Sequence, residues 1–426
     1  MNAPAAPPSQ TRAMPWRALR HRNFRLYFFG QCVSLLGTWI QQVAMGWLAY
    51  RLTGSPLLLG AVAFLTQAPQ LVVGPLSGVL IDRADRRKLM LTTQSLMLLQ
   101  AAVLAVLASF GWIEPWHLPP AALVLGVLNS VDAPLRHALV GQLVEDRADL
   151  SNAIALNTLS FNTARFVGPP VAGVLLAATS EATCFAMNAL SFLAVIAALL
   201  KLSLAPRVAA AGALRGAFGD GLRYVRDTHT VRALLTQVAV TNFLAAPYAA
   251  LMPALARDQF RGGPDTLGLL LGAAGCGALA AGLQLAVRAS VRGLTGVTAS
   301  ASLLSALALA GFAATQEVWL AALLMFITGY AQISLNASAN TILQTVVPDH
   351  LRGRVMALFP ASVLGTAAIG GLIAGSVAEH WGARIALAAM ALALFGVALH
   401  FRRRLGKLQD HTRNLYEALG VPPKSG

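Results

Sequence analysis

The chain has 426 residues, of which 56% are hydrophobic and only 12% are charged, and its formal net charge is +15. A soluble domain carries about 25% charged residues, so this composition excludes an ordinary soluble enzyme and indicates a polytopic membrane protein. The basic residues stand at the ends of apolar runs rather than in one patch, which argues against a nucleic-acid partner. The three cysteines lie inside apolar runs without metal-type spacing, so we expect no metal ion.

Apolar runs of about 20 residues are long enough to cross a bilayer, and the chain holds about twelve of them. We expect a cytoplasmic tail over 1–23, a six-helix half over 24–204, a cytoplasmic connector over 205–230, a second six-helix half over 231–401 and a cytoplasmic tail over 402–426. The predicted helices lie at about 24–50, 57–81, 89–110, 119–140, 153–178, 183–204, 231–256, 266–287, 294–314, 318–341, 355–378 and 383–401.

The positions of Lys and Arg predict the orientation. With the N-terminus in the cytoplasm, 27 of the 32 basic residues fall on the inner side, four on the outer side and one, Arg165, inside a span. This asymmetry obeys the positive-inside rule. It predicts that both termini are cytoplasmic, and the abundance of Ala, Gly and Arg favours a bacterial inner membrane. In the connector, Phe218, Leu222 and Val225 follow helical spacing and predict an amphipathic helix at the membrane surface.

A charged loop separates the second and third predicted spans. It holds a glycine four residues before an Asp-Arg pair, followed by further basic residues: Gly78, Asp82, Arg83, Arg86 and Arg87. This stretch resembles the cytoplasmic loop between helices two and three of the major facilitator superfamily, except for Asp85, where the family usually has Gly. The resemblance implies that Asp82 faces the start of helix eleven. That contact would lock the halves together on the inside when the protein opens outward.

The fourth predicted span ends with Asp132 and Arg136. A charge inside a membrane is costly and is by default functional. The two residues stand four apart and can neutralise each other. The resemblance implies instead a latch between Asp132 and Arg86, and a proton-coupling role for Asp132 also stays open.

The fifth predicted span contains Arg165, Gly168, Pro169 and Gly173. This stretch resembles the Gly-Pro-x-x-Gly-Gly motif that marks drug and proton antiporters of the superfamily, with Ala172 in place of the penultimate Gly. A generic Gly/Pro hinge explains it equally well. Arg165 is either a third partner for Asp132 or a ligand for an anionic substrate group.

Polar residues form stripes along three further spans. Gln31, Thr38 and Gln41 share one face of the first span with Ser34. The resemblance places helices one, four, seven and ten around a central path, which makes these stripes candidate substrate ligands. Interhelical hydrogen bonding is the alternative for each residue. The candidates in the seventh and tenth spans are Asn242, Tyr248, Gln332, Asn336 and Asn340.

Further stretches, at 132–140, 152–157, 221–226 and 351–356, resemble the bacterial subfamily that includes enterobactin exporters. We find no phosphate loop and no nucleophilic triad, so we expect neither an enzyme nor a cofactor. The sequence predicts an all-α membrane protein of the major facilitator fold, acting as a monomer in the lipid bilayer. The predicted function is proton-coupled export of a siderophore, drug-like compound or metabolite. Uptake, facilitated diffusion and a non-transporting receptor are the alternatives.

Overall fold

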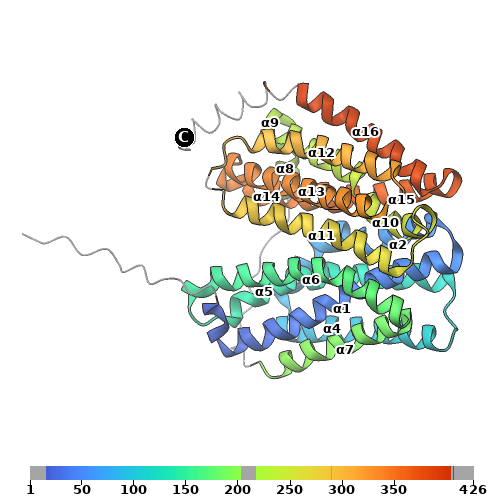
Figure 1. The fold of residues 1–426 in the computed structure, drawn as a ribbon. Helices are drawn as coiled ribbons and strands as arrows, with labels where there is room; N and C mark the ends of the chain where they lie inside the picture. The colour runs from blue at the N-terminus through green and yellow to red at the C-terminus, as the bar shows by residue number, and fades with distance from the viewer. Residues whose placement is uncertain (1–15, 203–216, 289, 404–405, 407–426) are drawn as a thin grey trace, which may run out of the picture.

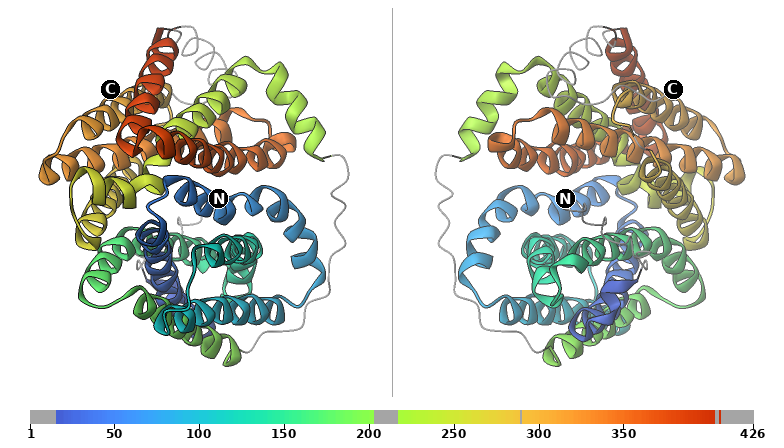
Figure 2. Two further views of the ribbon diagram at one scale, coloured as in Figure 1. Left: turned by 90° about the vertical axis from the view of Figure 1, so that its right-hand side faces the viewer. Right: turned by 90° about the vertical axis from the view of Figure 1, so that its left-hand side faces the viewer.

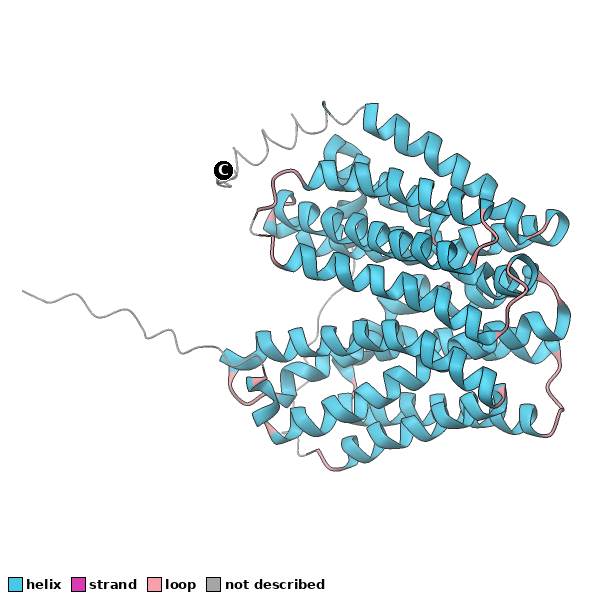
Figure 3. Cartoon of the chain, in the orientation of Figure 1, coloured by secondary structure: helices cyan, strands magenta, loops and turns pink. Residues whose placement is uncertain are grey.

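The computed structural model describes residues 16–202, 217–288, 290–403 and 406, without the side chains of 75, 79, 82 and 217–221. Predictions for most of both tails, for 203–216, and for the side chains of Asp82 and Phe218 therefore lie outside the described residues. Within the described part the chain is helical and contains no strand (Figure 3).

Nine of the helices are continuous over a whole predicted span. In the first half they are α1 (Arg22–Thr53), α4 (Arg86–Ser109), α5 (Leu118–Leu143), α6 (Leu150–Ala178) and α7 (Glu181–Leu200). In the second half they are α11 (Pro264–Ala286), α12 (Leu294–Ala314), α13 (Val318–Val346) and α16 (Ala383–Arg403).

The other three spans are interrupted near prolines, because proline lacks the amide hydrogen that a continuous helix needs. The second span divides at Ala68 and the seventh at Ala246, while the eleventh passes through a π-turn after Pro360. Their pieces are α2 (Pro56–Gln67) and α3 (Pro69–Arg83); α9 (His229–Ala245), α10 (Pro247–Ala254) and η4 (Leu255–Gln259); and α14 (Asp349–Pro360), η5 (Ala361–Gly365) and α15 (Thr366–Trp381).

Ten helical segments of the described chain are long and apolar enough to cross a membrane. Helices α1 and α6 are not among them, although they have 32 and 29 residues. At about 1.5 Å per residue they exceed the roughly 30 Å of a hydrocarbon core. Polar residues such as Gln31 and Gln41 of α1 and Arg165 of α6 lower the hydropathy of these two helices, and all three are predicted functional residues.

The helices form two halves that lie against each other (Figures 1 and 2). In the first half α1 packs against α7 and α6, and in the second α13 packs against α11 and α12. Across the boundary α2 packs against α15, and α6 packs against α11. We call the end of the bundle where α1 ends at Thr53 and α2 begins at Pro56 the outer end. The end where α3 finishes at Arg83 is the inner end.

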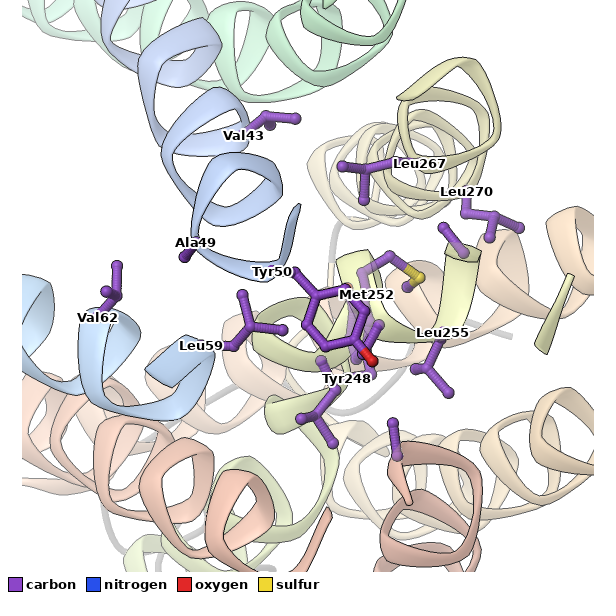
Figure 4. Packing of buried hydrophobic residues seen from close by; sticks show 14 of the residues in the cluster. Val43, Ala49, Tyr50, Leu59, Val62, Tyr248, Met252, Leu255, Leu267 and Leu270 are labelled. Carbon is purple, nitrogen blue, oxygen red and sulfur yellow. The ribbon is translucent and has the colours of Figure 1, made fainter. Parts of the chain in front are cut away.

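The buried core is shared at the outer end and divided at the inner end. One large cluster joins residues of both halves, among them Tyr50 and Leu59 of the first and Met252 of the second (Figure 4). At the inner end each half has a cluster of its own, one around Phe24 and one around Val355. Burial of apolar surface therefore holds the halves together from the outer side.

The connector contributes helix α8 (Ala217–Asp227) to the inner end of the second half. Tyr224 and Val225 pack against the cluster around Val355, while Leu222 is exposed. The helix is therefore present where the sequence predicts one, and Val225 packs partly buried against the second half.

Candidate functional site

Glycines let the two halves approach closely, for example between α2 and α15 and between α6 and α11. A Cβ atom on Gly60 of α2 would lie 2.6 Å from the carbonyl oxygen of Gly371, and one on Gly173 of α6 would lie 2.7 Å from the Cα atom of Gly268. Small residues let helix backbones touch in this way. Gly173, predicted as a hinge residue, thus lies at a contact between the halves. Gly78 instead has no atom within 4 Å of where a Cβ would stand.

Four side chains that the sequence did not single out join the halves at the outer end. The Tyr50 hydroxyl of α1 donates a hydrogen bond to Asp258 of η4. Glu379 of α15 accepts from Ser55 Oγ at 2.8 Å and from the Leu57 amide at 3.0 Å, so it caps the start of α2. The partners are far apart in sequence and in different halves, and local spacing carries no signal for such pairs.

At the inner end the basic loop binds its own half. Arg86 Nη1 donates to the carbonyl of Ala138 at 2.9 Å, and Arg87 donates to the last carbonyls of α7 at 2.8 and 2.7 Å. Asp85 caps α4 by accepting from the amides of Arg87 and Lys88, which explains an acid at this departure from the family pattern. Arg83 is exposed.

Asp132 is 3% exposed and has partners on both carboxylate oxygens. Gln94 Nε2 donates to Oδ1 at 2.7 Å, and Arg136 Nε lies 2.9 Å from Oδ2. The structure thus places Arg136 at Asp132, and Arg86 at Ala138, six residues further along α5. The suggested pairing of Arg86 with Asp132 is not formed in this conformation, because the neutralising partner comes from the same helix.

The chain before α1 is fixed to the loop between α5 and α6 by Asp149, which is 1% exposed. Its carboxylate lies 3.0 Å from Arg17, 2.7 Å from Arg20 and 2.9 Å from His21. The hydrogen bond from His21 lowers the pKa of the Asp149 carboxyl; burial opposes this effect, and the charges of Arg20 and Arg17 add to it. No sequence pattern marks this cluster, since Asp149 stands among several ordinary loop acids.

Helix α6 brings its predicted residues to α1. A Cβ atom on Gly168 would lie 2.4 Å from Cβ of Trp39, so this glycine allows α1 and α6 to touch. The Arg165 guanidinium lies 5.9 Å from the centroid of the Trp39 ring, and Pro169 is buried. Arg165 is therefore placed beside an aromatic ring rather than beside Asp132, whose oxygens are already bound.

The polar stripe of α1 divides between two environments. Gln41 accepts from Asn188 of α7 at 2.7 Å and donates to Gln100 of α4 at 2.8 Å, so it serves interhelical hydrogen bonding within the first half. Thr38 donates to a backbone carbonyl of its own helix. Gln31 is 2% exposed, and its Oε1 atom has no hydrogen-bond partner among the described residues.

The seventh and tenth spans do bring predicted residues together. Asn242 Nδ2 donates to Asn336 Oδ1 at 2.9 Å, and Asn336 returns a hydrogen bond at 3.3 Å. Asn340 accepts from a neighbour on its own helix, and the buried Gln332 has an Nε2 atom with no partner among the described residues. Tyr248 belongs to the core shared by the halves (Figure 4).

Two cavities of about 590 and 470 Å³ lie in the second half. The first is lined by Gln284, Arg288 and Tyr330, between α11, α12 and α13, and the second by Asp258 and Arg384 at the outer end. Neither is lined by a predicted site residue. The candidate site is instead the interface between the halves, where Arg165 of α6 lies near Tyr248 of α10, with the asparagine pair inside the second half.

Two helical halves that meet at one end, with polar residues between them, are the architecture of the major facilitator fold. The comparison with solved structures confirms this fold. A bacterial homolog of the human lysosomal transporter Spinster, in an inward-facing and unoccupied conformation, matches with a TM-score of 0.69. The match covers 92% of this chain and 98% of that chain at 13% identity.

The chain belongs to the transmembrane secretion effector family, whose model matches residues 13–419. It is a multi-pass membrane transporter and not an enzyme. The staphyloferrin A transporter of Staphylococcus aureus is 26% identical over 84% of this chain and 90% of that protein. The multidrug efflux pump Tap of Mycolicibacterium fortuitum is 28% identical over 90% of this chain and 96% of that protein. The predicted superfamily and fold are thereby confirmed.

Proposed function

We propose that the protein exports a small molecule from the cytoplasm by alternating access, driven by the proton gradient. The observation that carries this proposal is the one-sided contact between the halves, with a shared core at the outer end and separate cores at the inner end. In the predicted orientation, with both termini in the cytoplasm of a bacterial cell, this conformation accepts cargo from the inside. The efflux names of several relatives support the direction.

Between the halves, the side chains proposed to meet the cargo are Gln31, Thr38, Asn242, Tyr248, Gln332, Asn336 and Asn340. We leave out Gln41, because its amide is fully engaged between α4 and α7. Siderophores, drug-like compounds and other metabolites are the cargo classes that the relatives' names support. The transporter acts as a monomer.

The inner end closes when the protein opens outward, and we propose that the loop after α3 then forms the latch. Asp82 would meet the start of α14, and Arg86 would leave the Ala138 carbonyl. A carboxylate at a helix N-terminus contributes about 0.3–1 kcal/mol when exposed. An energy of this size shifts the equilibrium between the two conformations but leaves both of them populated.

Comparison of metabolites in cells with and without the protein tests the direction. We expect at least one compound to be depleted inside and enriched in the medium of expressing cells, and nigericin to abolish the difference. Gly173→Leu should remove the effect, because its side chain would collide with Gly268. Gly396→Leu is the matched control, since its Cβ meets open space.

Accumulation of the compound inside expressing cells would show uptake instead. An unchanged metabolite profile, with the folded protein present in the membrane, would favour the receptor alternative.

A further inference from the structure

Arg165 is a charged side chain of α6 that lies between the two halves. Its guanidinium packs over Trp39 of α1, and it lies within electrostatic range of the Tyr248 hydroxyl on α10. Helix α1 belongs to one half and α10 to the other. The exposed side chain of Arg165 therefore faces the interface between the halves and not the lipid.

The neighbours of Arg165 on α6 support this placement. Thr158, Asn162 and Arg165 follow at helical spacing on one face, and all three are exposed. The faces on either side are occupied, because Gly168 touches α1 and Phe166 touches α11. The exposed strip thus runs between α1 and α11, which is where a cargo entering from the inner end would pass.

No acid of the described chain neutralises Arg165. Its one described close contact is the Trp39 ring, and no hydrogen bond or ion pair to another described residue is formed. The carboxylate of Asp132 already binds Arg136 and Gln94, so it is not a partner for Arg165. A cation inside a membrane protein is costly when it has no partner, and such residues commonly mark a substrate path. A bound molecule with a negatively charged group would supply the partner that the described chain does not.

We propose that Arg165 binds the carboxylate of an organic anion, with Trp39 and Tyr248 flanking the apolar part of the same molecule. This inference names the cargo class and rests on the proposed export function. A guanidinium binds a carboxylate through two parallel hydrogen bonds. Trp39 also contacts Phe161 edge to face, with centroids 6.1 Å apart, so an aromatic surface adjoins the charge. Together these groups select organic anions over neutral molecules of the same shape.

Binding to the purified full-length protein in detergent micelles tests the proposal without requiring transport. The probes are benzoate and phenylacetate, each compared with its neutral amide, and the readout is the ligand-induced rise in Tm. We expect both carboxylates to stabilise the wild-type protein more than their amides do. In Arg165→Gln we expect affinity for the carboxylates to fall about ten- to hundredfold, because a charge-assisted hydrogen-bond pair is lost.

Arg165→Lys keeps the charge and should retain part of the affinity, while Arg223→Gln removes an exposed connector charge and should retain all of it. Carboxylate binding by Arg165→Gln equal to the wild type would overturn the proposal. So would a folded wild-type protein that no carboxylate stabilises. Normal carboxylate binding without any export from cells would leave the anion site standing and refute the export function alone.

Discussion

The outer and inner ends of the bundle use the same kinds of contact for different purposes. At the outer end Tyr50 with Asp258, and Glu379 with the start of α2, join one half to the other. At the inner end the described polar contacts whose partners are both described stay within a half, as for Arg86 and Asp149. In the alternating access proposed above, the outer contacts break in every transport cycle, whereas the inner ones can persist.

The expected energies of the outer and inner contacts agree with the idea that the outer ones break and the inner ones persist. A hydrogen bond such as that of Tyr50 contributes about 0.5–1.5 kcal/mol net, which thermal motion and cargo binding can overcome. The buried pair of Asp132 and Arg136 is different, because removing one partner of a buried pair costs about 3–5 kcal/mol. Changes at the outer end should therefore shift the conformation, and changes at the inner end should lower the amount of folded protein.

The largest effect is expected for Asp132→Asn. It would leave Arg136 buried without its counter-ion and reduce the stability of the fold by about 3–5 kcal/mol. We expect a strong fall in the amount of protein recovered in the membrane, measured by size-exclusion chromatography of the solubilised protein.

The double variant Asp132→Asn with Arg136→Gln should recover most of this loss, since removing both partners of a buried pair is often nearly neutral. If the single variant folds normally but its transport no longer depends on the proton gradient, Asp132 is a proton carrier and its structural assignment is wrong.

Gly60→Ala should act on the conformation instead. The added Cβ would lie 2.6 Å from the Gly371 carbonyl oxygen, and overpacking of this kind costs about 1–3 kcal/mol. The equilibrium ratio of outer-closed to outer-open molecules should fall by about five- to 150-fold. Labelling of a cysteine placed at Val43, in the shared core, should become faster from outside. Gly396→Ala should label like the wild type, and equal rates for Gly60→Ala would refute the outer closure.

Much of the fold could be predicted from the sequence, because apolar runs and basic loops are local signals. The identity of partners across helices could not. Gln41 has the spacing of a cavity residue, yet its partners Asn188 and Gln100 lie on two other helices of the same half. Helical periodicity gives the face of one helix but not the neighbour that the face meets.

Because periodicity does not identify the neighbouring helix, the sequence did not predict the contacts at the outer end. For Asn242 and Asn336 it predicted the site residues but not their hydrogen bond. Asn242 and Asn336 were both predicted as site residues, and the structure adds that they bind each other. Tyr50 and Glu379 occur at helix ends, where aromatic and acidic residues are common in any membrane protein. The partners of Tyr50 and Glu379 can be identified only from the three-dimensional arrangement of the two halves.

Tyr50→Phe tests the outer end with a smaller change. It removes the hydroxyl that reaches Asp258 and keeps the ring that packs against Met252 and Leu59 in the shared core. We expect a shift of the equilibrium toward the outward-open state of about two- to tenfold. Distance measurements between spin labels at the outer ends of the halves would detect it, and an unchanged distance distribution would contradict a gating role for this bond.

The smallest conformational effect is expected for Asp149→Asn, at the inner end. Its neighbours Arg17, Arg20 and His21 all belong to the chain segment that it holds. The lowered pKa of Asp149 means that the native state favours the ionised carboxylate. The stabilising contribution of this carboxylate is therefore present above the ordinary unfolded pKa of about 3.9 and is lost as the pH falls through the lower native value.

At pH 7 the Asp149→Asn variant should melt a few degrees below the wild type, with the cysteine at Val43 labelled at the wild-type rate. The difference in Tm should stay constant down to about pH 5 and narrow below about pH 4, where the wild-type carboxylate takes up its proton. A difference in Tm that grows in acid, or a changed labelling rate at neutral pH, would show that the Asp149 cluster moves with the gates and is not a fixed part of its half.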